Sequence, residues 1–230
     1  MTPGAGAARA AGHASAAQRP STRRLSDDER ERRARLRRDT KLARHRTRIL
    51  DAVAHCFAER GYHDTSVDQV VSRARSSKSA FYACFANKET AFAALLEREG
   101  ERVLRTVEQA VTDESDPRRR ARAGITTFVT DCAANQATAR ILLVESVGIS
   151  PAIEERRRAL HRRFAELIRA QAEAARAAGT PATTVDLDVL AFALVGAVNE
   201  AVVHLLDSGR SDPAPVVAAL GLLASRALLP

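Results

Sequence analysis

Apolar side chains recur every three or four residues from Arg46 to the end of the chain, and this period constrains the fold more than any other feature. An α-helix brings residues with such spacing to one face. No segment shows the sustained alternation of apolar and polar residues that is typical of a half-buried strand. We therefore predict an all-α protein of about nine helices.

Capping residues and helix breakers divide this pattern into segments. Ser, Thr, Asp and Asn side chains favour helix starts, whereas Gly and Pro favour the ends. The predicted helices are about 46–60, 66–73, 77–84, 88–113, 118–134, 136–147, 151–178, 185–207 and 213–229. The expected caps are Thr65 or Ser66, Ser77, Asn87, Ser150 and Thr184. A three-helix head at 46–92 would thus precede a larger helical body at 93–230.

The net charge of +8 belongs to the N-terminal fifth of the chain. Residues 1–48 contain 14 Lys and Arg against 5 Asp and Glu, whereas the remaining residues contain 22 against 23. Residues 1–22 are small and polar, which predicts disorder, and Ser26 followed by acidic residues is a candidate helix start. We interpret residues 1–45 as a disordered, basic arm. Such an arm could lie along DNA phosphates or in a minor groove, or be a solvated run of charge.

Other counts exclude several classes of protein. Cys56, Cys84 and Cys132 are odd in number and far apart, which excludes a disulfide framework and a zinc-ribbon site and fits a reducing cytosol. The N-terminus lacks the apolar core of a secretion signal. The longest apolar run, Val189 to Val198, is half of the roughly 20 residues that a membrane span needs. We expect a cytoplasmic, nucleoid-associated protein with no membrane partner.

The sequence also argues against an enzyme. It has no Gly-rich phosphate loop, no HExxH and no GxSxG motif. Each cysteine stands alone, without a patterned histidine partner, so a cysteine nucleophile is the weakest alternative. We expect neither a metal site nor a cofactor.

The helices at 66–73 and 77–84 are separated by a three-residue turn, the spacing of a helix-turn-helix. In that motif the N-terminal residues of the second helix reach base edges in the major groove. The candidates here are Ser77, Lys78, Ser79, Ala80 and Tyr82. The small residues allow a close approach to the duplex, while Lys78 and Tyr82 supply a charge and a hydroxyl for phosphates. Phe81 and Phe85 are expected in the core of the head.

The stretch from Arg48 to Glu89 resembles the N-terminal domain of TetR-family transcriptional regulators. The resemblance covers about 42 residues without a gap. It is carried by Ile49, Leu50, Phe57, Gly61, Tyr62, Thr65, Ser66, Val67, Ser77, Lys78, Phe81, Tyr82, Phe85, Lys88 and Glu89. The helical body also fits this family, although its sequence match is diffuse.

The resemblance implies a function and further site residues. Thr65 and Ser66 would meet the DNA backbone at the start of the second helix, and Lys88 would contact a phosphate at the start of the fourth. The body would bind an unknown small-molecule effector and form a homodimer through its last two helices. The chain would then be a repressor that binds a near-palindromic, double-stranded DNA operator and is released by that effector. The alternative from another class is a non-specific architectural DNA-binding protein.

Four residues of the head depart from the family pattern. Arg75 stands where the turn usually has Gly, so either the turn differs or Arg75 tolerates a positive φ while it reaches a phosphate. Arg75 could equally be a solvated turn residue. Ser76 replaces an apolar residue, Ser79 a common Gly, and Cys84 a frequent His. We expect one phosphate contact fewer at Cys84, because a thiol donates weakly.

In the body, polar residues interrupt an apolar helix at Asn199 and Glu200, and buried polar groups need partners. The candidate effector pocket is lined by Phe128, Cys132, Leu143, Phe164, Asn199 and Glu200. The alternative is ordinary core with a polar outer side. Ala193, Gly196 and Ala197 allow close helix packing, either in a dimer or within one chain.

Overall fold

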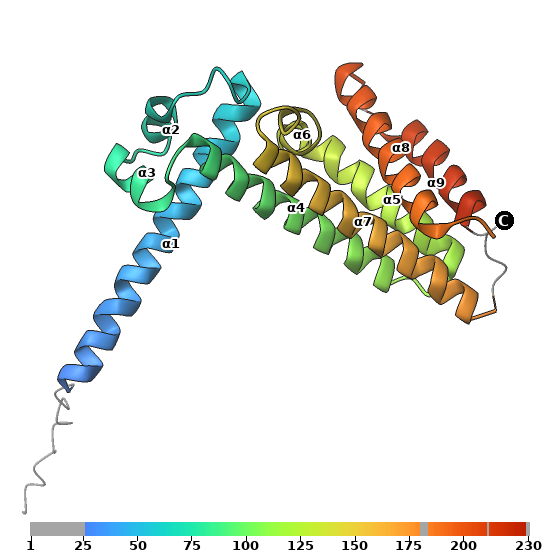
Figure 1. Ribbon diagram of the computed structural model, residues 1–230, viewed down its shortest axis with the longest axis horizontal. Coiled ribbons are helices and arrows are strands. Elements are labelled where there is room, and N and C mark those ends of the chain that lie inside the picture. The colour runs from blue at the N-terminus through green and yellow to red at the C-terminus, as the bar shows by residue number, and fades with distance from the viewer. Residues whose placement is uncertain (1–25, 180–183, 211, 229–230) are drawn as a thin grey trace, which may run out of the picture. The chain divides into compact units, whose positions relative to one another are not determined.

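A computed structural model describes residues 26–179, 184–210 and 212–228, and these are helices joined by turns, with no strand among them (Figure 1). The predicted disorder of residues 1–22 lies outside the described residues. The elements are α1 (Asp27–Arg60), α2 (Val67–Arg73), α3 (Lys78–Cys84), α4 (Lys88–Thr112), α5 (Pro117–Ala134), α6 (Gln136–Arg140), the π-helical η1 (Ile141–Glu145), α7 (Pro151–Ala177), α8 (Leu187–Asp207) and α9 (Ala214–Leu228). The predicted all-α fold is confirmed.

Most helix starts follow the predicted caps. Ser66, Ser77, Asn87 and Ser150 each accept a hydrogen bond from a backbone N–H in the first turn of their helices. The prediction of Thr184 for α8 was wrong. Asp186 caps this helix, because its Oδ1 accepts from the backbone N–H groups of Asp188 and Val189 in the first turn, at 2.9 and 3.1 Å.

The first helix differs from the prediction in length, because it begins at Asp27 instead of near residue 46. Ser26 and Glu29 form a capping pair: Ser26 N donates to Glu29 Oε2 at 2.9 Å, and Glu29 N donates to Ser26 Oγ at 3.2 Å. The Arg, Leu and Ala residues that follow are good helix formers. Residues 27–45 of the predicted arm are therefore helical.

The chain divides into two compact units, residues 1–40 and 41–230. In the first unit, the arginines at 32, 33, 35, 37 and 38 are exposed. The second unit contains the head and the body, which share one hydrophobic core. In the head, Ile49, Val53 and Phe57 of α1 pack with buried side chains of α2, α3 and α4. Phe81 and Phe85 belong to this core, as predicted.

Helix α4 joins the head to the body (Figure 1). Its buried face runs from Ala91 to Val111, and it packs against α5 and α7. A chain of charges follows the same path. Arg98 pairs with Asp51 of α1 at 2.7 Å, and Arg102 binds Asp131 of α5 through two N–H···O bonds of 2.8 Å. The buried Glu99 lies between these arginines and pairs with both.

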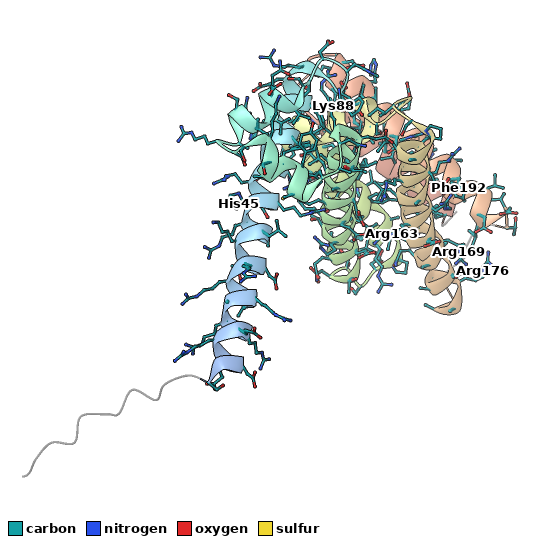
Figure 2. The ribbon with its side chains drawn as sticks, turned by 60° about the vertical axis from the view of Figure 1, so that its left-hand side comes forward. His45, Lys88, Arg163, Arg169, Arg176 and Phe192 are labelled. Carbon is teal, nitrogen blue, oxygen red and sulfur yellow. The ribbon has the colours of Figure 1, made fainter. Side chains whose placement is uncertain are left out.

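Helix α8 is, within the described part of the chain, the one helix that is long and apolar enough to cross a membrane by length and composition. It packs against α5, α7 and α9, and it buries Leu194, Val202 and Leu205. These buried residues form the one face of α8 that contributes to the core of the body. Its opposite face carries exposed apolar residues, among them Phe192, which Figure 2 shows on the surface of the body.

Candidate functional site

The turn between α2 and α3 sets the geometry of the helix-turn-helix. Arg75 has a φ of +46°, so it adopts the left-handed conformation that glycine favours. Its N–H donates to Ser72 O at 3.1 Å, and the N–H of Ser76 donates to Val71 O at 2.9 Å. These two bonds form a Schellman motif at the end of α2. Arg75 thus takes the backbone conformation of a glycine, and its exposed side chain points away from the core.

Ser76 weakens this turn. A Schellman motif is often accompanied by an apolar contact from the residue that Ser76 replaces. The Ser76 Oγ is instead buried, and it has no hydrogen-bond partner within the described residues. A buried polar atom without a partner loses its hydration and gains nothing in return.

Most predicted residues of the recognition helix α3 face solvent. Ser77, Lys78 and Ser79 are exposed, Ala80 is half-buried, and Tyr82 keeps 54% of its surface exposed. Because Phe81 and Phe85 anchor the other side of this short helix, the polar side chains at its start project together. Small residues there leave room for a groove edge.

Lys78 lies at the first turn of α3 and pairs with Asp68 of α2, with Nζ and Oδ1 2.8 Å apart. The hydrogen bond that Lys78 donates to the Asp68 carboxylate raises the pKa of Lys78. Both side chains are exposed, so this pair contributes little to stability. The Lys78 ammonium can therefore exchange the carboxylate for a DNA phosphate at small cost.

Two side chains that were predicted to contact DNA donate hydrogen bonds to backbone carbonyls of the head instead. Thr65 is 2% exposed, and its hydroxyl donates to the carbonyls of Gly61 and Cys56 at 2.8 and 3.2 Å. Lys88, labelled in Figure 2, donates from Nζ to the carbonyls of Tyr62 and His63 at 2.7 and 3.2 Å. Its Nζ also lies 4.3 Å from the centre of the Tyr62 ring, and burial lowers its pKa. These two polar groups close the α1–α2 turn, whereas the neighbouring Ser66 is exposed and caps α2.

Sequence reasoning missed the contacts that join this turn to the body. Tyr62 N donates to Glu145 Oε2 of the π-helical turn η1 at 3.1 Å. Gly61, with a φ of +78°, leaves room for that carboxylate. Ser150, at the start of α7, donates to Glu89 Oε1 at 2.7 Å. Short π-helices often mark functional sites, but no local sequence signal pointed to Glu145.

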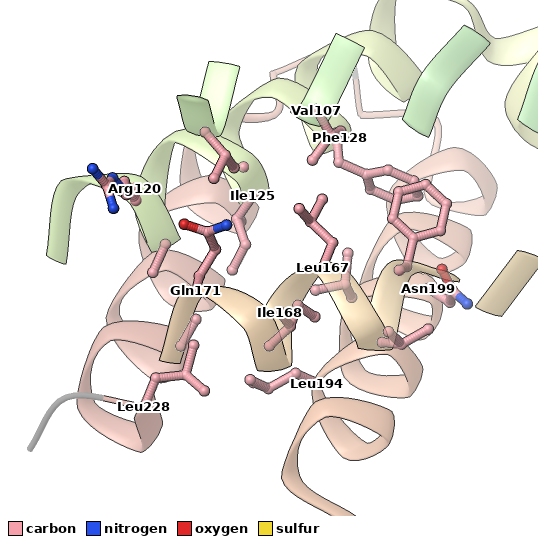
Figure 3. Close-up of a pocket in the computed structure, with 17 residues that line it drawn as sticks. Val107, Arg120, Ile125, Phe128, Leu167, Ile168, Gln171, Leu194, Asn199 and Leu228 are labelled. Carbon is pink, nitrogen blue, oxygen red and sulfur yellow. The ribbon is translucent and has the colours of Figure 1, made fainter. Parts of the chain in front are cut away.

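The body encloses an apolar cavity between α4, α5, α7, α8 and α9. Its empty volume is about 730 Å³, open solvent at its mouth included. Figure 3 shows Ile125, Leu167, Ile168 and Leu194 along its middle. The polar side chains of the lining are Arg120, Gln171 and Asn199. Asn199 Nδ2 lies 3.1 Å from His161 Nε2, and burial lowers the pKa of His161.

The predicted pocket residues divide into two groups. Phe128, Phe164 and Asn199 line the cavity, and the two phenyl rings meet edge to face with centroids 5.6 Å apart. Cys132 is buried and Leu143 is half-buried in the core, and neither lines the cavity. Glu200 is exposed on the outer face of α8. One residue along a helix is a rotation of about 100°, which separates Glu200 from its inward-facing neighbour.

Models of protein families match both parts of the chain. A model described as bacterial regulatory proteins, tetR family, matches residues 49–95. A second model, described as the tetracyclin repressor-like C-terminal domain, matches residues 114–228, which is half of the chain. The chain belongs to the TetR family.

Known relatives of this TetR-family protein are regulators. It is 34% identical over 83 residues to the HTH-type transcriptional activator FasR of Mycolicibacterium smegmatis, over 36% of this chain and 38% of FasR. The match thus spans little more than a third of FasR. It is 25% identical over 189 residues to YdgC of Bacillus subtilis, an uncharacterized HTH-type transcriptional regulator, over 80% of this chain and 93% of YdgC. We conclude that it is a DNA-binding transcriptional regulator.

A solved structure shares its fold. The transcriptional regulator FadR from Bacillus subtilis, crystallised in complex with stearoyl-CoA, superposes with a TM-score of 0.72 at 16% identity. The superposition covers 78% of this chain and 97% of FadR. It confirms the predicted order of an N-terminal helix-turn-helix and a larger helical body.

The two buried cysteines of this TetR-family protein are poorly suited to nucleophilic chemistry. Burial raises the pKa of the Cys132 thiol to about 12, and burial also raises the pKa of Cys56. Both thiols therefore remain protonated near neutral pH, whereas a thiol must ionise before it can attack. Across the residues that the structure describes, no group of three or more His, Cys, Asp or Glu side chains is arranged to hold a metal ion.

Proposed function

We propose that this regulator is a repressor that binds a near-palindromic operator as a homodimer and is released when a small effector enters the cavity of the body. The exposed start of α3, held by the buried Phe81 and Phe85, is the observation that carries the proposal. We assign DNA reading to residues 46–92 and effector binding and dimerisation to residues 93–230. The DNA contacts that the geometry supports are Ser66, Arg75, Ser77, Lys78, Ser79, Ala80 and Tyr82.

Exposed apolar residues support a homodimer through α8 and α9. Val189 and Phe192 on α8 are 68% and 49% exposed, and Leu222 and Leu223 on α9 are 52% and 47% exposed. Val189 and Phe192 are three residues apart and so share one face of α8, and a contiguous exposed apolar face of this kind would suit an interaction site. A two-fold dimer sets two recognition helices on half-sites about one DNA turn, or a multiple of it, apart.

The chemistry of the cavity supports an apolar effector. Its lining is almost wholly aliphatic and aromatic. The FadR structure of the same fold holds a fatty acyl thioester, which makes an acyl chain a reasonable occupant. The protein would act in the cytoplasm, at the nucleoid, where its operator lies.

Two variants test the interface at the level of single residues. We expect Lys78→Ala to weaken operator binding, because it removes a positive charge from the groove-facing end of α3. Asp68→Ala is the matched control, because it breaks the same ion pair but leaves the Lys78 charge in place, and it should not weaken binding. Tyr82→Ala should weaken binding without unfolding the protein. Unchanged affinity in Lys78→Ala or Tyr82→Ala would remove that residue from the interface.

Selection of bound DNA from a random pool tests site specificity and dimer symmetry together. We expect an inverted repeat. The basic N-terminal segment favours the second candidate, an architectural DNA-binding protein, which would select no preferred sequence. A reporter gene placed behind the selected site then distinguishes repression from activation.

A further inference from the structure

The cavity of the body has one charged residue in its described lining. Arg120, in the first turns of α5, is half-buried, and its Nε donates to the carbonyl oxygen of Glu114 at 2.6 Å. Within the described residues, no carboxylate forms an ion pair with it. The Glu114 carboxylate lies near Arg119 instead, with 3.5 Å between Oε1 and Nε. Arg120 is thus a half-buried cation in the lining of an apolar cavity, and no described carboxylate is its counter-ion.

An arginine in this position favours an anion. A half-buried cation loses hydration, and a bound carboxylate would replace that hydration with charge-assisted hydrogen bonds. The guanidinium plane matches a carboxylate with two parallel N–H···O bonds, a geometry that a single-point cation does not provide. Gln171 lies near Arg120 on the same side of the cavity in Figure 3 and adds an amide donor there.

The rest of the cavity defines the body of the ligand. Figure 3 places Asn199 at the side opposite Arg120, with apolar residues such as Leu167 and Leu194 between them. Along α5 the lining extends from Arg120 to Phe128, which is about 12 Å at the rise of an α-helix. Asn199 is neutral and already bonded to His161. The cavity therefore has an anion-binding end, an apolar middle and a neutral polar end.

We propose that the effector is an amphipathic carboxylic acid whose carboxylate binds Arg120 and whose alkyl or aryl body fills the apolar middle. This inference rests on the proposed function, in that the cavity is taken as the effector site. We expect Arg120 to favour a free carboxylate over a thioester of the same acyl group, because the carbonyl group of a thioester is uncharged. Arg120 would then determine the effector's head group.

The test measures binding of three probes to the full chain by calorimetry: decanoate, methyl decanoate and decanoyl-CoA. Arg120→Gln should weaken decanoate binding by about ten- to a hundredfold, the range expected for hydrogen bonds to a charged group. Methyl decanoate, which has the same body without the charge, should bind both proteins equally. Arg119→Gln is the matched control, because it removes a neighbouring charge outside the cavity lining, and it should leave decanoate binding unchanged.

A variant with the opposite charge distinguishes loss of the carboxylate site from loss of folding. Arg120→Glu should lose decanoate and gain affinity for decyltrimethylammonium, which loss of folding cannot produce. The proposal is overturned if Arg120→Gln weakens acid and ester equally or not at all, if decanoyl-CoA binds and decanoate does not, or if no probe binds. Operator release is measured separately: decanoate binding without release would contradict the proposed regulation but leave the carboxylate site in place.

Discussion

Replacement of Arg75 by glycine is expected to stabilise the protein and to lower its affinity for DNA. Arg75 adopts a φ of +46° at the end of α2. A left-handed conformation costs a residue with a side chain about 1–2 kcal/mol, and glycine avoids that cost. Glycine also gives the unfolded chain more freedom, which removes about 0.4–1 kcal/mol of the gain. The net increase in the free energy of unfolding should be about 0.5–1 kcal/mol.

Thermal unfolding at a fixed protein concentration measures this gain. For a chain of this length a change of about 1 kcal/mol moves the Tm by roughly 2–4 °C. Arg75→Ala is the matched control, because it removes the same side chain and keeps a Cβ at the same φ. Only the glycine variant should melt later than the wild type.

Operator binding separates the side chain from the backbone. If the Arg75 guanidinium contacts a phosphate, both variants lose that contact, and the slope of log affinity against log salt becomes shallower by about one. We thus expect Arg75→Gly and Arg75→Ala to differ in melting temperature and to bind the operator with the same affinity. Equal melting temperatures for Arg75→Gly and Arg75→Ala would refute the inference that backbone strain is stored at this turn.

Three further predictions concern other parts of the chain. Ser76→Ala should raise the free energy of unfolding by about 1 kcal/mol in a denaturant titration, because it removes a buried hydroxyl without a partner; a less stable variant would contradict this. Deletion of residues 1–40 should flatten the salt dependence of operator binding and keep the preferred sequence, whereas an unchanged slope would show that this segment stays off the phosphates. Burial lowers the pKa of His161 below 6.5 in the folded protein, so the unfolded chain binds more protons. The contribution of His161 to stability should therefore be complete above pH 6.5 and be lost as the pH falls through the lowered pKa. In melting curves recorded across this range, His161→Gln should lose less stability than the wild type.

Local signals in the sequence were enough to predict the head. The Ser66 cap, the short turn and the Ser77 cap involve residues within a few positions of one another, so their geometry follows from neighbouring residues. The burial of Phe81 and the exposure of Tyr82 also follow from helical periodicity. The departure of Arg75 from glycine was visible in the sequence, but which of two turn geometries resulted was not.

The candidate cavity could be predicted only in part. Phe128, Phe164 and Asn199 were found because large or polar residues on apolar helices are conspicuous. Arg120 was missed because it stands in a run of arginines that looks solvated, and only the packing of α5 against α7 and α9 places it in the lining of the cavity.

The sequence by itself determined most of the helices and their caps, the helix-turn-helix and the family, because these depend on contacts within a few residues. Only the tertiary structure decided which polar groups are free to act. Lys88 and Thr65 bind carbonyls of the α1–α2 turn, Glu200 faces solvent, and Arg120 lines the cavity. The physical reason is that the partner of a polar group, or its lack of one, is set by helices that are distant in the chain.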